Sequence, residues 1–209
     1  MPPPVLLIHG AAVTSGIWAP VIERLAGLDV VAVDRPCTGS LEAEVAWLAP
    51  HAEGAFVVGV SGGATLGLAL AATATRLAGA LVHEPAVGAL APGLLDPIAA
   101  AYAADGLAGF GAALYGPRWS IDLAPPGPSR LDLELTMFRS FDPAAPRPGQ
   151  GPVIASVGAL SPPIRHASVA ALRERFGIAT AVLDGSGHFA PADAPDALAA
   201  LIRASIRGL

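Results

Sequence analysis

The chain of 209 residues has a single cysteine, few charges and few aromatic side chains. With Cys37 alone, no intrachain disulfide can form, and nothing indicates an oxidising compartment. Charged residues make up 14% and the net charge is −5, so the chain lacks the basic patch that binds nucleic acid or anionic membranes. We therefore expect neither of these partners.

The N-terminus also lacks a targeting signal. "MPPPVLLIHG" has no basic residue, and its apolar run is too short for a secretory signal peptide. Apart from Ala- and Gly-rich stretches that are better interpreted as core helices, no segment reaches the ~18 apolar residues of a membrane span. We expect a soluble, cytoplasmic protein, and nothing in the sequence indicates its oligomeric state.

Short apolar runs and longer helix-like segments alternate along the chain, which is typical of a parallel sheet buried on both faces. The sequence therefore predicts a doubly wound α/β fold, whose ligand site lies at the carboxyl ends of the strands. The predicted strands are 5–8, 30–33, 55–60, 80–83, 152–157 and 180–183, and the predicted helices are 16–26, 41–53, 62–78, 165–176 and 195–207.

Residues 85–151 interrupt this alternation and predict an inserted, mainly helical cap on a core formed by 1–84 and 152–209. A structureless connection of roughly 65 residues would be unusual in a compact domain. The clearest helix in it is 130–141. Its aromatic residues Tyr102, Tyr115 and Trp119 are candidates for a pocket lining, and we assign Trp119 to the substrate pocket.

The segment "FVVGVSGGATLG" (56–67) places Ser61 in a G-x-S-x-G pattern between a predicted strand and a predicted helix. A serine on such a sharp turn has strained backbone angles, and small residues two positions away on either side let the turn close. The following helix directs its N-terminal amides at a developing oxyanion. Alone, the pattern also fits a serine that caps a helix.

Two further segments extend the pattern: "LLIHGAAVTSGIW" (6–18) and "LDGSGHFAPADAPDAL" (183–198), each a strand followed by a glycine-flanked turn and a helix. With the serine turn between them, and with "VDRPCTGS" (33–40), the chain resembles serine hydrolases of the α/β-hydrolase superfamily. The resemblance implies a short form of that fold, beginning at what would be the family's third strand.

The resemblance implies that Ser61 is the nucleophile, that His188 is the general base and that the N–H groups of Ala11 and Gly62 form the oxyanion hole. It implies no cofactor. His9 belongs to a turn and is interpreted as structural. No grouping of His, Cys and Asp has metal-ligand spacing, so we expect no metal.

The third member of the triad is absent from its usual place. The family's acid generally follows the strand predicted at 152–157, where this chain has Leu160. Glu84, at the end of the strand after the serine helix, also satisfies the order Ser, acid, His. The placement resembles that in haloalkane dehalogenases and in zearalenone-type lactone hydrolases, which have a similar "VHE-x-P" segment. We therefore assign Glu84 as the acid, with a cap-anchoring carboxylate as the alternative.

The other carboxylates are weaker candidates. Asp184 and Asp193 lie too near His188 along the chain to orient it, and Asp34 is interpreted as a turn residue. A serine nucleophile, in place of the aspartate of the dehalogenases, favours acyl transfer.

The leading hypothesis is a hydrolase of a small apolar ester or lactone that works through an acyl-enzyme, on a neutral small molecule. The alternatives are a catalytically silent ligand-binding protein and a carbon–carbon hydrolase or lyase with the same triad.

Overall fold

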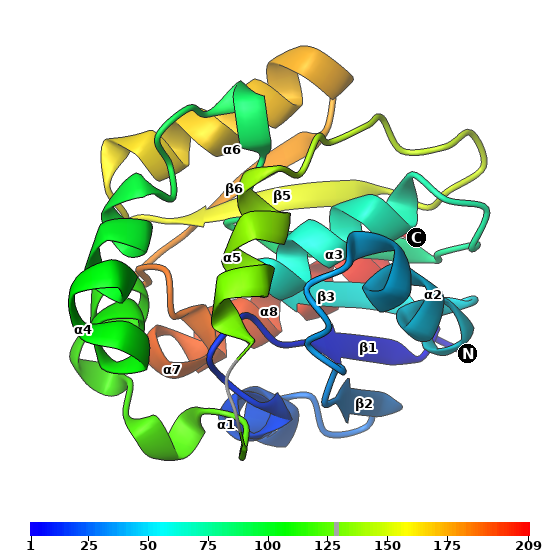
Figure 1. Cartoon of the computed structure of the whole chain (residues 1–209). Helices are drawn as coiled ribbons and strands as arrows, with labels where there is room; N and C mark the ends of the chain where they lie inside the picture. Colours follow the sequence, from blue (N-terminus) through cyan, green and yellow to red (C-terminus); the bar gives the residue numbers. More distant parts are fainter. Residues whose placement is uncertain (128–129) are drawn as a thin grey trace.

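A computed structural model describes residues 1–127 and 130–209, which leaves only residues 128–129 of the predicted cap outside the described chain. Its centre is a six-stranded sheet, all parallel, in the order β2-β1-β3-β4-β5-β6 (Figure 1). The strands are β1 (Val5–Ile8), β2 (Val30–Val33), β3 (Phe56–Val60), β4 (Gly79–His83), β5 (Val153–Gly158) and β6 (Ala179–Leu183). Each predicted strand is present within one residue at either end.

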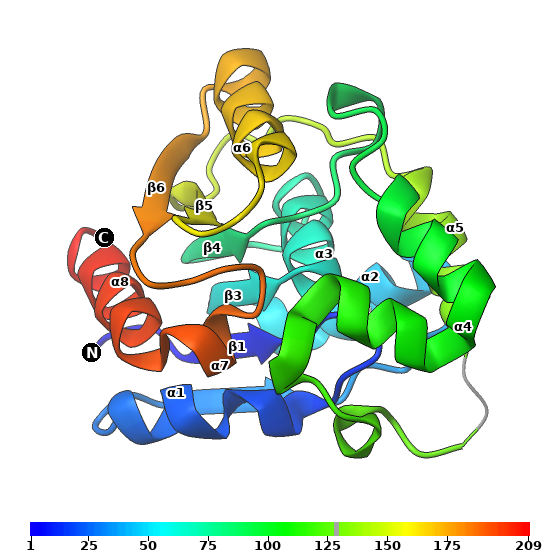
Figure 2. The ribbon, with the colours of Figure 1, turned by 90° about the vertical axis from the view of Figure 1, so that its left-hand side faces the viewer.

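Helices cover both faces of the sheet, which confirms the doubly wound α/β architecture (Figures 1 and 2). On one face α2 packs against α3, and on the other α1 packs against α8. The helices of the core are α1 (Ala19–Arg24), preceded by the 3-10 helix η1 (Ser15–Trp18), then α2 (Leu41–Ala52), α3 (Gly62–Ala71), α6 (Pro163–Phe176), α7 (Ala190–Asp193) and α8 (Pro195–Arg207).

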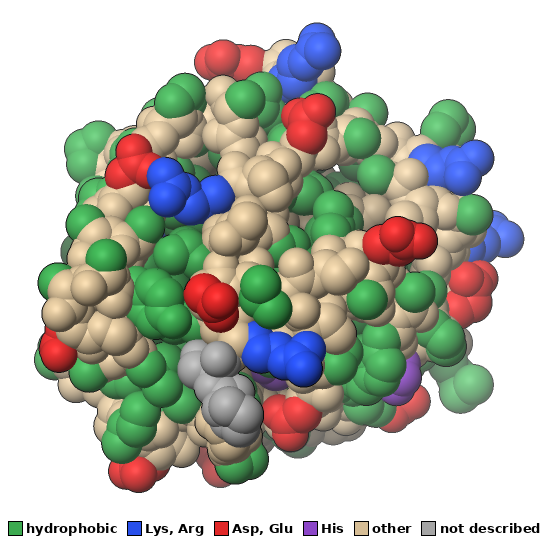
Figure 3. All heavy atoms as spheres, in the orientation of Figure 1, with side chains coloured by type: hydrophobic (Ala, Val, Ile, Leu, Met, Phe, Trp, Pro, Cys, Tyr) green, Lys and Arg blue, Asp and Glu red, His purple; other side chains and the backbone are tan. Residues whose placement is uncertain are grey.

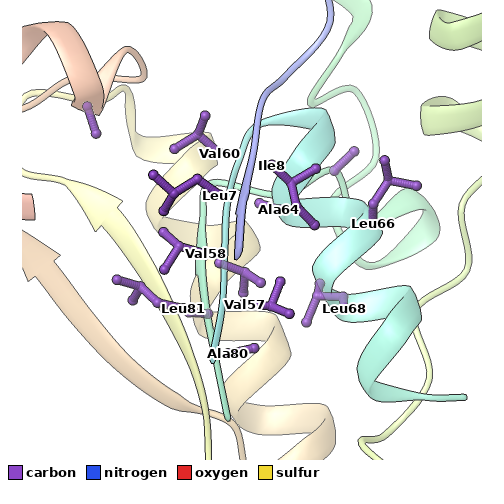
Figure 4. Packing of buried hydrophobic residues seen from close by; sticks show 14 of the residues in the cluster. Leu7, Ile8, Val57, Val58, Val60, Ala64, Leu66, Leu68, Ala80 and Leu81 are labelled. Carbon is purple, nitrogen blue, oxygen red and sulfur yellow. The ribbon is translucent and has the colours of Figure 1, made fainter. Parts of the chain in front are cut away.

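The core forms where the apolar strands meet α3. Residues of β3 alternate between the two faces, so that Val57 points toward α3 and Val58 points away from it (Figure 4). Leu66 and Leu70 of α3 are fully buried, as are Val57 and Val58. This two-sided burial explains why the central strands are continuous apolar runs.

Side chains of the two edge strands are more exposed to solvent than those of the central strands. Val31 of β2 is 48% exposed and Val182 of β6 is 59% exposed. On the face drawn in Figure 3, acidic and basic side chains are scattered singly, without a cluster of one sign. The few charges on this face are thus spread over it.

The helix predicted over 62–78 is shorter in the structure, where α3 ends at Ala71. The Thr73 hydroxyl donates to the carbonyl of Leu70 at 2.7 Å and accepts from the N–H of Thr75 at 3.2 Å. Threonines that bond to the local backbone in this way compete with the helical ladder. The prediction was too long because apolar residues continue in the sequence beyond Ala71, where these hydrogen bonds end the helix.

The segment 85–151 contains two helices, α4 (Asp96–Tyr115) and α5 (Leu131–Arg139), with the 3-10 turns η2 (Gly88–Leu90), η3 (Gly116–Arg118) and η4 (Ile121–Leu123). α4 lies beyond the carboxyl ends of the strands, in front of the sheet when it is viewed end-on (Figure 2). The predicted helix 130–141 is present as α5. The longer α4 has no clear apolar periodicity in the sequence.

The stretch Asp96–Arg118 is the one candidate for a membrane span in the described part of the chain, by length and by a mean hydropathy of 1.2. Asp105 and Gly106 within it have non-helical backbone angles. A break in the hydrogen-bond ladder and a carboxylate near mid-length are both costly inside a bilayer. These features argue against one membrane-spanning helix and favour two helical segments that pack above the sheet.

Candidate active site

Ser61 lies on the sharp turn between β3 and α3. Its backbone has φ 55° and ψ −121°, a left-handed conformation that costs a non-glycine residue free energy. The glycines of the motif are explained by close packing, because a Cβ at Gly59 would overlap the carbonyl of Gly63, and a Cβ at Gly63 would overlap that of Ile8. The turn therefore holds the serine at the carboxyl end of the sheet.

Ala11 and Gly62 line a small cavity together with Ser61. Within the described residues, neither backbone N–H is used in a hydrogen bond. Gly62 is the first residue of α3, and the N–H of a first helical residue has no partner within the helix. This N–H lies at the positive end of the helix dipole. The two amides are thus available to an oxyanion.

A buried arginine holds the turn that carries Ala11. Arg35 donates to the carbonyls of His9 at 3.2 Å and Gly10 at 2.9 Å, and its own N–H donates to His9 Nε2 at 3.2 Å. It also pairs with the buried Glu44 and Glu134. Burial and Arg35 lower the pKa of His9 to about 3, so this histidine stays neutral and structural.

Glu84 follows β4 directly and is 1% exposed, with φ 49°. Its Oε1 accepts from the Gly158 N–H at 2.9 Å and from the Ser161 hydroxyl. Its Oε2 lies 2.7 Å from His188 Nδ1 and 3.2 Å from Arg165 Nε. Burial alone would raise the pKa of Glu84, but hydrogen bonding and the neighbouring His188 and Arg165 keep it well below its usual value. The carboxylate is ionised and fixed.

His188 donates its Nδ1 proton to Glu84, which leaves Nε2 as an acceptor. Burial, reinforced by the charge of Arg165, lowers the pKa of His188 to about 4, whereas Glu84 opposes the shift. The imidazole is therefore neutral at pH 7, which is the form that accepts a proton from a nucleophile.

The structure does not join Ser61 directly to His188. In the described chain His188 Nε2 has no hydrogen-bond partner. The Tyr115 hydroxyl lies beside Ser61, since a Cβ at Gly10 would meet both, and it donates to the carbonyl of Ala11 at 2.6 Å. The Tyr115 ring stacks on His188 with centroids 5.7 Å apart. A tyrosine at the end of α4 thus lies next to both Ser61 and His188.

The loop that carries His188 is tied to β4 and β5. Buried His83 contacts the Gly187 carbonyl through Nε2 at 3.2 Å and the Ser156 hydroxyl through Nδ1 at 3.0 Å. A Cβ at Gly158 would overlap the carbonyls of Ser186 and Gly187, so only glycine lets the loop pass this close. These contacts fix the position of the imidazole.

Leu160 and Trp119 fall outside the polar site. Leu160 is 74% exposed, and its N–H donates to the carbonyl of Ser186 at 2.9 Å. Trp119 lines neither the cavity at Ser61 nor the cleft beside His188. It packs over Gly111, and its indole N–H donates to the carbonyl of Ala12 at 2.9 Å. Our assignment of Trp119 to the substrate pocket therefore has no support from this geometry.

Sequence reasoning missed three residues at the site: Arg165, the hydroxyl role of Tyr115, and His83. Arg165 was placed only within a predicted helix, and its approach to Glu84 depends on how α6 follows β5. The one local signal was the "VHE" segment, where His83 precedes Glu84. Contacts across the sheet ends carry no fixed sequence spacing.

The cavity at Ser61 has a volume of only about 20 Å³ and is lined mostly by apolar residues of α4 and α5: Leu95, Ile98, Phe110, Leu114, Leu135 and Phe138. A larger cleft of about 530 Å³ opens beside His188 and Tyr115. Ile98, Leu114 and Arg165 line both spaces. The wall between the cleft and the nucleophile is therefore made by α4 and the start of α6.

A sequence model of the alpha/beta hydrolase family matches residues 5–201, nearly the whole chain. The chain belongs to the alpha/beta hydrolase family. No curated protein sequence gives a significant match.

Solved structures of other alpha/beta hydrolases share the fold. They include RedJ thioesterase of the prodiginine biosynthetic pathway in Streptomyces coelicolor (20% identity, TM-score 0.71, covering 98% of this chain and 89% of that one). An enol-lactonase from Burkholderia xenovorans LB400 is 18% identical (TM-score 0.68, 98% and 91%). Naproxen esterase from Bacillus subtilis is 16% identical (TM-score 0.66, 97% and 83%). At these identities the likeness establishes the fold, and membership of the family rests on the sequence model.

Within residues 1–127 and 130–209, no group of three or more His, Cys, Asp or Glu side chains has the geometry of a metal site. Cys37 is a free thiol whose pKa is raised to about 11 by burial. A protonated thiol is a poor nucleophile. Burial thus makes Cys37 a weak candidate for a nucleophile.

The pH dependence of this hydrolase should follow His188. Because its folded pKa is depressed toward 4, the base stays neutral through pH 6 and is protonated only at lower pH. We expect kcat/KM for an ester to be flat from pH 8 to about pH 5 and to fall below that, by about tenfold per pH unit at the acid end. A kcat/KM profile that already halves near pH 6.5 would show an unshifted histidine.

Tyr115→Phe should make Ser61 more reactive, because the phenol hydroxyl beside Ser61 competes with His188 as a hydrogen-bond partner of the serine. One neutral hydrogen bond is worth ~0.5–1.5 kcal/mol, so inactivation by a serine-directed phosphonate should be about 2- to 12-fold faster. The Ala11 carbonyl loses its donor, and the melting temperature should fall. Tyr102→Phe, which removes a hydroxyl elsewhere on α4, is the control. Slower inactivation would instead make the Tyr115 hydroxyl an aid to catalysis.

Proposed function

We propose that this chain is a cofactor-independent serine hydrolase that cleaves a carboxylic ester or lactone through an acyl-enzyme. The observation that carries the proposal is the 2.7 Å contact between His188 Nδ1 and Glu84 Oε2, beside a strained serine turn. The acid assigned to the end of β4 thus has the partner that a triad requires. The 85–151 segment acts as the cap, since α4 and α5 line the cavity at Ser61.

In the proposed reaction, the Ser61 hydroxyl first turns to donate its proton to His188 Nε2, which has no partner in the described chain. His188 takes the proton as Ser61 Oγ attacks the carbonyl carbon, and Ala11 and Gly62 N–H groups bind the oxyanion. The imidazolium, stabilised by Glu84, then protonates the leaving alkoxide. Water activated by His188 attacks the acyl-enzyme, and Ser61 recovers its proton when the acid leaves.

An apolar acyl group fits the small cavity best, because its walls are leucine, isoleucine and phenylalanine side chains from α4 and α5. The cavity is too small for a substrate as it stands, so these helices must move apart on binding. The break at Asp105 and Gly106 divides α4 and offers a place for that movement. We also propose a cytoplasmic location, in keeping with the lone free cysteine.

A catalytically silent ligand-binding protein is the second candidate. The unpartnered His188 Nε2, together with the Tyr115 hydroxyl beside Ser61, favours it. In that case Tyr115 would permanently block the serine, and a ligand would occupy only the outer cleft.

Hydrolysis of p-nitrophenyl hexanoate distinguishes the two candidates. The proposed enzyme releases p-nitrophenol with a burst of about one equivalent, loses activity with a serine-directed phosphonate, and gains the phosphonate mass on the peptide containing Ser61. A silent binding protein gives no turnover above buffer and no labelled Ser61. Labelling elsewhere would refute the assignment of the nucleophile.

A further inference from the structure

The cleft beside His188 has an excess of positive charge, although the chain as a whole carries −5. The charged side chains that line it are Arg118, Arg165 and Asp193. Asp193 is already engaged: its Oδ1 lies 3.3 Å from Arg118 Nε, and its Oδ2 accepts from the Gly187 N–H at 3.1 Å. Arg118 therefore has its counter-charge within the cleft, whereas Glu84, which pairs with Arg165, does not line the cleft and is shared with His188.

Arg165 is nearly buried, with 7% of its side chain exposed, yet it uses only part of its hydrogen-bonding capacity. Its Nε pairs with Glu84 at 3.2 Å, whereas its two terminal nitrogens make no hydrogen bond or ion pair with the described residues. A guanidinium presents its donors as a planar fork that fits a carboxylate. Since Arg165 lines both the cleft and the cavity at Ser61, the unused donors lie at the boundary between the two.

The position of Arg165 is unfavourable for a triad that acts on a neutral substrate. During acyl transfer His188 becomes an imidazolium, so that two cations then share the single carboxylate of Glu84. The positive charge of Arg165 already lowers the pKa of His188. A negative charge on the far side of Arg165 would offset this repulsion at the moment when the imidazolium forms.

We propose that Arg165 binds a carboxylate on the substrate, so that the cleaved ester or lactone carries an acid group in the outer cleft. This inference rests on the proposed function and narrows its substrate class. It also revises the expectation of a neutral substrate, because Arg165 lines both the outer cleft and the otherwise mostly apolar cavity at Ser61. The substrate then has an apolar acyl segment at the serine and an anionic end at Arg165.

The test compares mono-p-nitrophenyl adipate with p-nitrophenyl hexanoate, which differ by a carboxylate in place of a methyl group. For the wild-type enzyme we expect kcat/KM to favour the adipate by about tenfold or more, since charge-assisted bonds are the strong ones. Arg165→Met should reduce this ratio by about 10- to 100-fold, and Arg165→Lys by less. Arg118→Met, which removes the paired arginine of the same cleft, should leave the ratio within about threefold.

The ratio separates recognition from a purely structural role. If Arg165→Met lowers kcat/KM for both esters equally, Arg165 serves only Glu84, and the inference is overturned. A wild-type preference for the hexanoate overturns it as well, without the use of any variant whose folding is in doubt.

Failure of the proposed function gives a different pattern. If the wild type hydrolyses neither ester, calorimetry with Ser61→Ala still measures whether the adipate ester binds more tightly than the hexanoate. Tighter binding of the adipate then supports Arg165 as an anion site on a silent protein. Equal affinities, or no binding, reject the anion site, whether or not the wild type is an esterase.

Discussion

Ser61→Ala should lower kcat for ester hydrolysis by about 10⁴-fold or more, because loss of a triad nucleophile leaves only binding and oxyanion stabilisation. The fold should persist, since Ala removes one hydroxyl and keeps the backbone of the turn. The measurement is steady-state release of p-nitrophenol, alongside thermal melting by circular dichroism. The melting temperature should change little, because the hydrogen bond that one neutral hydroxyl can make is worth only ~1 kcal/mol.

A matched control removes a hydroxyl far from the site. Ser205 lies in α8 near the C-terminus and bonds only within its own helix, to the carbonyl of Leu201 at 2.9 Å. Ser205→Ala should keep full activity. If Ser61→Ala retains more than about a hundredth of wild-type kcat, the nucleophile is another group.

Glu84→Gln should lower kcat by about 10³- to 10⁴-fold, with little change in KM. An amide cannot stabilise the imidazolium, and its NH2 group would face donors at either position: the Gly158 N–H and Ser161 hydroxyl at Oε1, or His188 Nδ1 and Arg165 Nε at Oε2. It also leaves Arg165 without its counter-charge in a buried position. Breaking such a pair costs ~3–5 kcal/mol, so the melting temperature should fall clearly. Activity should therefore be measured well below the new melting temperature.

Two further variants make this prediction sharper. Asp184→Asn removes an exposed carboxylate four residues before His188 and should have no effect on kcat. Leu160→Asp places an acid at the family's usual position; since Leu160 is 74% exposed, the wild-type fold should accept it. In the Glu84→Gln background, we expect Leu160→Asp to restore part of kcat. If Glu84→Gln alone keeps more than about a tenth of wild-type kcat, the base works without this carboxylate.

The fold was largely readable from the sequence, because its elements are specified locally. Six apolar runs with intervening helices predict the parallel sheet, and the structure places β1 to β6 within a residue of the prediction. The helix predictions failed where local hydrogen bonds ended a helix early or where the sequence had no apolar periodicity. Predicted helix 62–78 stops at Ala71, and α4, rich in alanine and glycine, shows no apolar stripe.

The residues of the candidate site differ in the same way, because some have a local sequence pattern and others depend on contacts made by the fold. Ser61 and His188 are each flanked by glycines within two residues, a local pattern that let the sequence alone propose them. The pairing of Glu84 with His188 joins residues 104 positions apart. It depends on β4 lying between β3 and β5, which brings the strand ends together. Sequence order allowed this pairing but could not exclude its alternatives.

The sequence by itself determined a parallel α/β sheet of the alpha/beta hydrolase family, with a serine turn at the carboxyl end of β3. The tertiary structure alone decided what surrounds that serine: the Tyr115 hydroxyl, the buried Arg165 and the small apolar cavity under α4 and α5. The physical reason is the range of the interactions. Turns and strands are fixed by neighbours in the chain, whereas burial, charge pairing and pKa depend on residues that only folding brings together.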